Sequence, residues 1–549
     1  MKEVILKYAL QNAFRHGRAE RNAVISKLFA EKPELKSKAK DIIKEVDSVI
    51  QDVNKLSPSE IENKLKELAP GLMEKKIVKE REGLPDLPNV KGKVVMRFAP
   101  FPSGPLHIGN ARPAILNDEY VKKYGGKLLL VIDDTIGSEE KTISKDAYKL
   151  IPESLEWLKV NFSKPIIYKS DRLEIYYKYA EELIKKDKAY VCSCPHEKLR
   201  ELRAKGIECK CRSNSIESNL DLWKKMFKAK EGSYILRIKT SMQHKNPAFR
   251  DRVIFRIAHR EHPKVGKKYT VWPLLEFSWA IDDHLLGITH VLRGKDLMME
   301  SEMEKHIWNI FGWPHSEIIH TGLIQIEGIK LSKSKSKKEV ETGKFTGWDD
   351  PRTASLQSFK RRGFRPEAIR NFCLSFGITQ TEIIAPIDIL YSENKKFLEK
   401  ESNRYFFIEN PVKIKIKDAP SLEEEIPLHP DYKERGFRKF KTKNEFYIQD
   451  KLERGKNYRL MHLFNFKDNK FISKGVDKNL NATLIHWLPV SKDLVNVEVL
   501  MPDGSIKKGL GEPPLKSLKA DDAIQFVRFG FVRLDKKEGN KLKFWYTHN

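Results

Sequence analysis

The spacing of hydrophobic and polar positions changes several times along the chain. Residues 1–82 place apolar side chains at helical intervals among many Lys and Glu, and a Gly/Pro-rich stretch follows at 83–88. This pattern predicts a helical N-terminal segment that ends in a linker. Charged residues interrupt every apolar stretch well before the ~18 residues of a membrane span, so we expect no membrane segment. The first residues also lack the apolar core of a signal peptide.

The next part of the chain alternates between strand and helix patterns. Apolar runs at 94–99 and 127–132 flank a Pro/Gly-rich turn at 100–105 and a helical pattern at 108–124. Strand, turn, helix and strand in this order form one unit of a parallel α/β sheet. A second such unit is predicted at 288–324. The residues between the two units, about 190–270, therefore predict an insertion that splits one nucleotide-binding fold.

After about residue 350 the pattern is first helical, to about 400, and then changes to short strands. Residues 412–417 alternate with period two, and further strands are predicted at 495–500, 523–533 and 541–546. Short strands separated by turn residues favour β-barrels.

Composition adds a basic charge and a reducing environment to this picture. The chain has 549 residues, too many for a single core, so three or four domains are expected. Its 103 Lys and Arg exceed its 76 Asp and Glu by 27, and such an excess attracts polyanions such as RNA or DNA. The alternative is a generally basic composition, because the lysines are spread along the whole chain. Four of the five cysteines are clustered, which indicates a metal site in a reducing compartment such as the cytoplasm.

A glycine-bearing turn joins the first predicted strand to the first helix of the α/β region, at 97–110. Gly104 and Gly109 allow a nucleotide to approach the backbone, and the helix start beyond them offers N–H donors to phosphate oxygens. His107 can donate to charge that develops on a phosphate during displacement. Taken alone, a histidine near a helix start is more often structural.

A Ser-rich basic segment lies in the second α/β half, at 328–334. Lys330 and Lys333, beside Ser332 and Ser334, can hold a triphosphate and stabilise the departing pyrophosphate. The alternative is a solvated basic loop, because more lysines follow directly. The occurrence of this segment and the turn at 97–110 on successive halves of one fold favours nucleotide binding.

Together the two motifs resemble the HIGH and KMSKS motifs of class I aminoacyl-tRNA synthetases. Segments 281–290, 347–352 and 525–531 extend the resemblance to the glutamyl/glutaminyl subgroup in its archaeal and eukaryotic form, over essentially the whole chain. The resemblance implies ATP as a substrate with Mg²⁺ on its phosphates, and an aminoacyl adenylate that passes its acyl group to tRNA. It assigns catalysis to His107, Asn110, Lys330 and Lys333. It assigns ATP binding to Pro100, Gly104, His107, Gly109, Asn110, Asp296, Lys330, Ser332, Lys333 and Ser334.

The resemblance also implies a multidomain α/β plus β architecture. It consists of an N-terminal helical extension, a split Rossmann-like catalytic domain, an inserted domain for the acceptor end, a helical stem-contact region and anticodon-binding β-barrels. The expected boundaries, in that order, are 1–88, 89–190 with 271–345, 191–270, 346–402 and 403–549.

The choice of amino acid rests on one arginine. Glutamate needs a cation for its side-chain carboxylate, whereas glutamine would leave that buried cation unpaired. In the resemblance, Arg293 falls where glutamyl enzymes place this arginine, Arg97 matches a second substrate arginine, and Asp133 matches the acid that holds the ammonium group. Phe101, Leu275 and Trp279 complete the expected glutamate-binding set.

Several pocket positions depart from the family pattern. They are Phe101, Asn110, Val131, Leu275 and Trp279, which replace smaller, polar or basic residues. Glutamate-tRNA ligation is the leading hypothesis. The alternatives are a glutaminyl enzyme, and a catalytically weak paralog that acts as a tRNA-binding protein. A small tRNA-modifying relative without anticodon domains does not fit the long C-terminal β region.

The cysteine cluster has the spacing of a zinc site. Cys192 and Cys194 form one tight pair, Cys209 and Cys211 form the other, and four thiolates can close a tetrahedral site without another ligand. The alternative is a chance cluster of reduced cysteines. A structural zinc ion would brace the insertion, whereas Cys373 fits a core position.

The expected partners follow from the resemblance. They are L-glutamate and tRNA(Glu), with tRNA(Gln) as a second candidate, and neither DNA nor a membrane. A tRNA-dependent amidotransferase or another translation protein is also a candidate partner. The basic run 360–365 is expected either to follow RNA phosphates or to be an exposed helix end.

Overall fold

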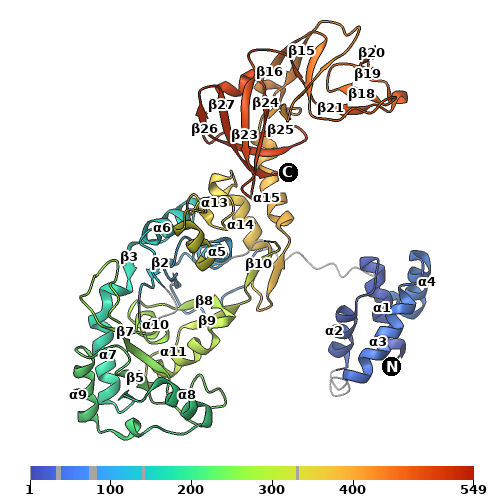
Figure 1. Ribbon diagram of the computed structural model, residues 1–549. Coiled ribbons are helices and arrows are strands. Elements are labelled where there is room, and N and C mark those ends of the chain that lie inside the picture. The colour runs from blue at the N-terminus through green and yellow to red at the C-terminus, as the bar shows by residue number, and fades with distance from the viewer. Residues whose placement is uncertain (1, 33–38, 73–82, 139–141, 329–332) are drawn as a thin grey trace. The chain divides into compact units, whose positions relative to one another are not determined.

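The computed structural model describes residues 2–32, 39–72, 83–138, 142–328 and 333–549. The chain folds into two compact units, Met1–Gly83 and Leu84–Asn549 (Figure 1). Within the described residues, no helix combines the length and the apolar character that are needed to cross a bilayer.

The first unit is built from helices, as the apolar spacing predicts. Ser57 begins the last of them through a capping box, in which its side chain accepts from the Glu60 N–H and its own N–H is bound by the Glu60 carboxylate. Ile5, Leu10 and Val24 are among the apolar residues buried between the helices. The helices are α1 (Lys2–His16), α2 (Arg21–Glu31), α3 (Ala39–Val53) and α4 (Pro58–Leu68).

A five-stranded, all-parallel sheet forms the centre of the second unit, in the order β3-β2-β1-β8-β9. This confirms the Rossmann-like fold. The chain passes from β1 outward to β3 and returns on the other side of β1, so a topological switch point lies between β1 and β8, where such folds bind ligands. The strands are β1 (Val95–Phe98), β2 (Lys127–Ile132), β3 (Ser163–Tyr168), β8 (His290–Gly294) and β9 (Glu317–Thr321).

Helices that follow the strands pack on this sheet and on the insertion beside it (Figure 1). They are α5 (Ile108–Lys123), α6 (Ala147–Trp157), α7 (Leu173–Lys185), α10 (Leu275–Leu285) and α11 (Met298–Phe311). The insertion contains a four-stranded antiparallel sheet, in the order β4-β5-β6-β7. Its elements are β4 (Ala189–Cys192), α8 (His196–Lys205), α9 (Ile216–Met226), β5 (Ile235–Ile238), β6 (Val253–Ile257) and β7 (Val271–Pro273).

A helical region and a small two-stranded sheet follow the parallel sheet. Strands β10 and β11 pair with each other in parallel, although helices lie between them in the sequence. The elements are β10 (Ile324–Ile326), α12 (Lys333–Glu341), α13 (Leu356–Arg361), α14 (Pro366–Ser375), β11 (Ile383–Ala385) and α15 (Ile387–Glu401).

The C-terminal region is rich in β-strands. Its seven-stranded sheet has the order β12-β25-β26-β27-β23-β24-β13, and its two edge strands are neighbours in sequence, joined through Phe406. The sheet therefore curls into a nearly closed barrel. Its strands are β12 (Arg404–Tyr405), β13 (Phe407–Glu409), β23 (Val495–Leu500), β24 (Ile506–Gly511), β25 (Ala523–Phe526), β26 (Gly530–Glu538) and β27 (Lys541–His548).

Smaller sheets complete this region, in the groupings β14-β17-β22, β15-β16 and β20-β19-β18-β21. Their strands are β14 (Val412–Lys415), β15 (Leu422–Pro427), β16 (Phe437–Thr442), β17 (Glu445–Ile448), β18 (Asn457–Leu460), β19 (Asn465–Lys467), β20 (Lys470–Ser473), β21 (Thr483–Ile485) and β22 (Leu488–Pro489).

The expected strand at 523–533 is instead a hairpin of β25 and β26. Arg528 adopts a left-handed conformation, φ 62°, which turns the chain. Gly530 follows with φ 135°, and a Cβ at this position would lie 2.7 Å from the carbonyl oxygen of His548. The close approach of β27 therefore requires a glycine here.

The basic run 360–365 is used for packing between the helical region and the barrel. The Arg361 guanidinium pairs with Asp349 and Asp535. Arg362 is buried and donates to the carbonyl oxygens of Tyr546 and Thr547. The expectation that the run follows RNA phosphates is therefore wrong for Arg362, which is buried and bound to protein carbonyls. For Arg361, which is partly exposed, it stays a prediction.

Candidate active site

The turn that carries His107 links the end of β1 to the start of α5. The carboxamide oxygen of Asn110 accepts a hydrogen bond from the His107 N–H at 3.4 Å, so Asn110 caps the first turn of the helix. Gly104 has φ 159°, and a Cβ there would lie 3.1 Å from the Trp348 ring. A glycine therefore favours the close approach of the Trp348 ring to this turn.

A cavity of about 490 Å³ brings this turn together with the carboxyl ends of β8 and β9. Gly294 lies at the end of β8, and a Cβ at that glycine would displace the Asp296 carboxylate from its position. The cavity thus unites His107, Gly109 and Asn110 with residues more than 180 positions away in sequence, at the switch point of the sheet. It is lined by His107, Gly109, Asn110, Arg112, Pro113, Gly294, Thr321, Gly322, Leu323, Ile324 and Gln325.

The structure describes only some of the remaining residues that are predicted to bind ATP. Pro100 lies in the turn, where its carbonyl oxygen accepts from the Asp133 N–H at 3.1 Å. Lys330 and Ser332 lie outside the described residues. Lys333 and Ser334 are the first two residues of α12, and only their backbone is described.

Every charged residue that is predicted to bind glutamate is already paired inside the protein. Arg97 binds Asp283 through two nitrogens, and Arg293 binds Glu304 through two nitrogens at 2.6 and 3.0 Å. The Asp133 carboxylate accepts from Lys169 at 3.1 Å.

All six of these side chains are at most 5% exposed, so the pairs are desolvated and strongly coupled to their partners. Since each charge faces an opposite one within the protein, the pocket carries three cations and three anions. The predicted residues are thus brought together, but as internal ion pairs.

Trp279 lies among these pairs. Its ring centroid is 4.8 Å from the Arg97 guanidinium carbon, 4.5 Å from that of Arg293 and 5.1 Å from the Lys169 ammonium nitrogen. Cations so close to an indole are attracted to its π-system. Trp279 is only 5% exposed, so its ring takes up space at the centre of the predicted pocket.

Burial shifts the proton affinity of two of the paired groups. Burial raises the pKa of Glu304, although the Arg293 guanidinium opposes this shift. Burial likewise lowers the pKa of Lys169 against the attraction of Asp133. Both shifts favour the neutral form, and the ion pairs oppose them.

Phe101 and Leu275 are half-buried at the ends of the elements that frame this pocket. Phe101 lies in the turn after β1, and Leu275 is the first residue of α10. The Ser278 hydroxyl, one turn along α10, donates to the Leu275 carbonyl oxygen at 3.1 Å and accepts from Lys169 at 2.8 Å. Helix α10 thereby positions both the lysine and Trp279.

The sequence pattern does not predict the residues that pair with the candidate glutamate-binding residues, namely Lys169, Asp283 and Glu304. Lys169 follows β3, an edge strand with half-exposed positions and therefore a weak apolar pattern. Its place at the carboxyl end of a parallel strand is the signal that could have revealed it. Nothing in the spacing of residues 293 and 304 indicates that they pair.

The four clustered cysteines converge in the insertion. Their sulfur atoms all lie within 4.8 Å of one another, with 3.7 Å between Cys192 and Cys209 and 3.8 Å between Cys194 and Cys211. A tetrahedral site with Zn–S bonds of ~2.3 Å requires sulfur separations of ~3.8 Å. The donor set and its spacing therefore fit a zinc ion.

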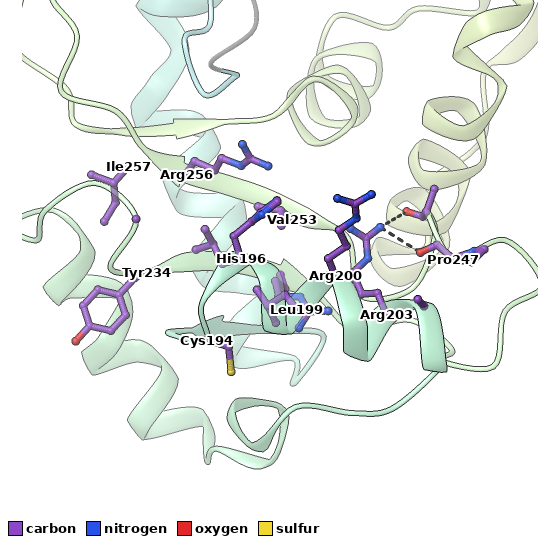
Figure 2. Close-up of a pocket in the computed structure, with 15 residues that line it drawn as sticks. Cys194, His196, Leu199, Arg200, Arg203, Tyr234, Pro247, Val253, Arg256 and Ile257 are labelled. Carbon is purple, nitrogen blue, oxygen red and sulfur yellow. Dashed lines mark hydrogen bonds between the residues drawn. The ribbon is translucent and has the colours of Figure 1, made fainter.

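A second cavity, of about 710 Å³, lies beside the cysteine cluster (Figure 2). His196, Arg200 and Arg203 reach it from α8, and Arg256 reaches it from β6. Its lining includes four arginines and neither Asp nor Glu. Arg203 also donates to the carbonyl oxygens of Pro247 and Ala248, which fixes its orientation. Such a cavity attracts an anion.

Comparison with known proteins agrees with this geometry. The family model of tRNA synthetases class I (E and Q), catalytic domain, matches residues 93–400. Two models of the anticodon-binding domain of the same family match 402–485 and 484–535.

Full-length relatives support the same assignment. The glutamate–tRNA ligase of Methanocaldococcus jannaschii is 46% identical, and both chains are covered completely. The ligases of Pyrococcus abyssi and Methanobrevibacter smithii are 44% and 43% identical, with all of this chain and at least 99% of theirs covered. Since the catalytic-domain model covers more than half of the chain and these relatives match it over its whole length, this chain belongs to the class I tRNA synthetases of the E and Q family.

Proposed function

We propose that this protein is a glutamate–tRNA ligase. It would use ATP to form glutamyl adenylate with release of pyrophosphate, and then transfer the glutamyl group to tRNA(Glu). The observation that carries the proposal is the cavity at the switch point, where His107 and the start of α5 meet the ends of β8 and β9. Full-length similarity to proteins named glutamate–tRNA ligase supports the choice of amino acid.

The residues of this cavity suggest how the first step is catalysed. Backbone N–H groups at the start of α5 and the His107 side chain would stabilise charge on the α-phosphate as the glutamate carboxylate attacks it. Lys330 and Lys333 would balance the charge of the departing pyrophosphate, and Asp296 would bind the ribose. Magnesium would neutralise part of the phosphate charge. Positioning and charge stabilisation would therefore supply most of the catalysis.

We assign recognition of the tRNA acceptor end to the insertion, and of the anticodon to the C-terminal β region. The arginine-lined cavity in Figure 2 supports the first assignment, because it offers positive charge without a competing carboxylate. The match of the two anticodon-binding models supports the second. Acceptance of tRNA(Gln), partnership with an amidotransferase and a cytoplasmic location belong to the same proposal.

The cysteine cluster would hold one structural zinc ion. The sulfur separations support tetrahedral coordination, and four thiolates leave no open position for catalysis. Elemental analysis should find about one zinc per chain in protein purified without chelator. Absence of zinc there, with full thermal stability, would contradict this assignment.

The function is tested by ATP–pyrophosphate exchange and tRNA charging, each with glutamate or glutamine and each with and without tRNA. Glutamate-dependent charging of tRNA(Glu) is the expected result. Activity with glutamine alone would replace the proposal by a glutaminyl enzyme. Binding of tRNA without either activity would make the chain a tRNA-binding paralog, the second alternative raised by the altered pocket.

A further inference from the structure

Two N–H donors remain without an acceptor in the amino-acid pocket. Among the described residues, neither the Trp279 indole Nε1 nor the Arg293 Nε has a hydrogen-bond partner, although both are buried. A buried donor without an acceptor is unfavourable, because it has lost its hydrogen bonds to water. The two donors belong to side chains in contact, since the guanidinium carbon lies 4.5 Å from the indole centroid. They therefore mark a place where a ligand acceptor would be favourable.

The rest of Arg293 is already committed. Its two terminal nitrogens bind the two carboxylate oxygens of Glu304, and Nη1 also contacts the Ser301 hydroxyl. Glu304 is fully buried on α11, directly behind the strand end that carries Arg293. Nε is therefore the one guanidinium nitrogen of Arg293 without a partner among the described residues, and Glu304 balances the charge of the guanidinium.

We propose that Glu304 and Trp279 determine how the pocket recognises its amino acid. Glu304, acting through Arg293, removes the surplus positive charge. The substrate side chain is then bound by the N–H groups of Trp279 and Arg293 rather than by a free cation. This inference rests on the proposed function and identifies the specificity determinants of that site.

The chemical consequence is weak discrimination between glutamate and glutamine. A free buried cation would reject glutamine, because the cation would remain unpaired. The indole N–H and the N–H of a charge-balanced guanidinium can donate to a carboxylate oxygen or to an amide oxygen. The same pocket therefore selects for an acceptor-bearing side chain of this length, and only modestly for its charge.

Glu304→Gln tests the role of the carboxylate. Glutamine keeps the size and one acceptor oxygen but leaves the Arg293 charge uncompensated. We expect the KM for glutamate to fall about 10-fold, with little change in kcat, while the KM for glutamine stays constant. Amino-acid-dependent ATP–pyrophosphate exchange measures both, and calorimetric titration of glutamate into the full-length protein measures binding directly.

Glu512→Gln is the matched control. Glu512 is also fully buried and paired with an arginine, Arg438, but both lie in the C-terminal β region. It should leave both KM values unchanged. If Glu304→Gln folds with a wild-type circular dichroism spectrum and leaves the glutamate-to-glutamine preference unaltered, Glu304 has only a structural role and the inference is wrong.

Trp279→Phe provides an independent test, because it keeps an aromatic ring between the cations and removes only the indole N–H. We expect the KM to rise about 10-fold for glutamate and for glutamine alike, with a smaller change in kcat. Trp487→Phe is its control, since Trp487 is buried in the C-terminal β region and donates to the Met461 carbonyl oxygen. Equal KM values in wild type and Trp279→Phe would overturn the role of the indole.

The wild-type protein separates this inference from the function on which it rests. Glutamate activation that is unaffected by Glu304→Gln and Trp279→Phe would leave the proposed function standing and overturn the inference. Failure of the wild type both to activate and to bind glutamate, with and without tRNA, would overturn both.

Discussion

The nucleotide side and the amino-acid side of this active site are built differently. On the nucleotide side, a capped helix start and the ends of β8 and β9 surround a cavity of about 490 Å³. On the amino-acid side, Arg97, Arg293 and Asp133 are each neutralised by a buried partner, and Trp279 lies among them. The nucleotide side is thus shaped by the backbone and by small residues, whereas the amino-acid side is shaped by side chains that bind one another.

This difference follows from what each half must recognise. Phosphates are bound by backbone N–H groups and flexible lysines, a set that glycines and a helix start supply wherever the local sequence permits. An amino-acid side chain is recognised by a few buried charges, and a single buried partner such as Glu304 can balance one of those charges. The chemistry of activation is therefore robust to sequence change, whereas substrate choice is sensitive to it.

Lys333→Ala should give the largest effect, because it acts on the nucleotide half. Loss of a cation that stabilises the departing pyrophosphate is expected to lower kcat of adenylate formation by about 100- to 1000-fold. The affinity for tRNA, measured by filter binding, should change much less. Equal losses in both measurements would remove the role assigned to this lysine.

Gly104→Ala should have the next largest effect. The added methyl group would lie 3.1 Å from the Trp348 ring on a backbone with φ 159°, so the ring or the HIGH-type turn must move by a few tenths of an ångström. A shift of the turn is expected to lower kcat/KM for ATP by about 10- to 100-fold. Gly92→Ala is a control for a positive φ without a close contact, because its φ is 119° and its Cβ would meet nothing within 4 Å. An unchanged kcat/KM in Gly104→Ala would show that the turn does not position ATP.

Asp283→Asn addresses the amino-acid half and should have a smaller effect. Asparagine can retain one hydrogen bond to Arg97 but removes the opposing charge. If the two halves act separately, we expect the KM for glutamate to fall about 5-fold while the KM for ATP is constant. A matching change in the KM for ATP would show that the two halves are coupled through β1, and the comparison would no longer hold.

The local pattern of the sequence predicted the elements but not the contacts across them. Strand β2 spans the predicted residues 127–132, because Leu128 to Ile132 are buried on both faces and leave a continuous apolar run. The hairpin at 523–533 was missed, since its turn is made by Arg528 in a left-handed conformation without a Gly, Pro or Asn before Gly530.

In the site, too, the sequence predicted local motifs but not the contacts between distant elements. His107, Gly109 and Asn110 are contiguous, so their motif could be predicted from the sequence. The Arg293–Glu304 pair depends on how α11 packs behind β8, and the Arg97–Asp283 pair depends on how α10 meets β1. Such pairings are tertiary, and apolar periodicity carries no information about them. The sequence therefore names candidate substrate residues, and it does not predict that their charges are balanced by partners inside the protein.

His548 lies outside both halves of the site, so its substitution should have the smallest effect on activity and a separate effect on stability. His548, at the end of β27, is buried, and burial lowers its pKa from 6.5 to about 4. The side-chain carboxamide oxygen of Asn394 accepts from the Arg365 backbone N–H, so the Asn394 side-chain NH₂ faces the His548 Nε2 at 2.9 Å. Nε2 must then be an acceptor, which requires a neutral imidazole, and nearby Arg362 and Lys395 also disfavour its charge.

Because the pKa of His548 is lower in the folded than in the unfolded state, the contribution of the neutral imidazole to the free energy of unfolding is fully present above pH 6.5. It decreases as the pH falls towards 4, since the unfolded state then binds a proton that the folded state does not. Chemical denaturation should show a decrease of about 2 kcal/mol in the free energy of unfolding between pH 7 and pH 5 that depends on His548. His548→Gln should remove that part of the pH dependence and leave glutamate and ATP KM values unchanged at pH 7. An identical pH dependence in His548→Gln would mean that the imidazole can be protonated in the folded state. A changed KM would show instead that the junction of β27 with α15 communicates with the active site.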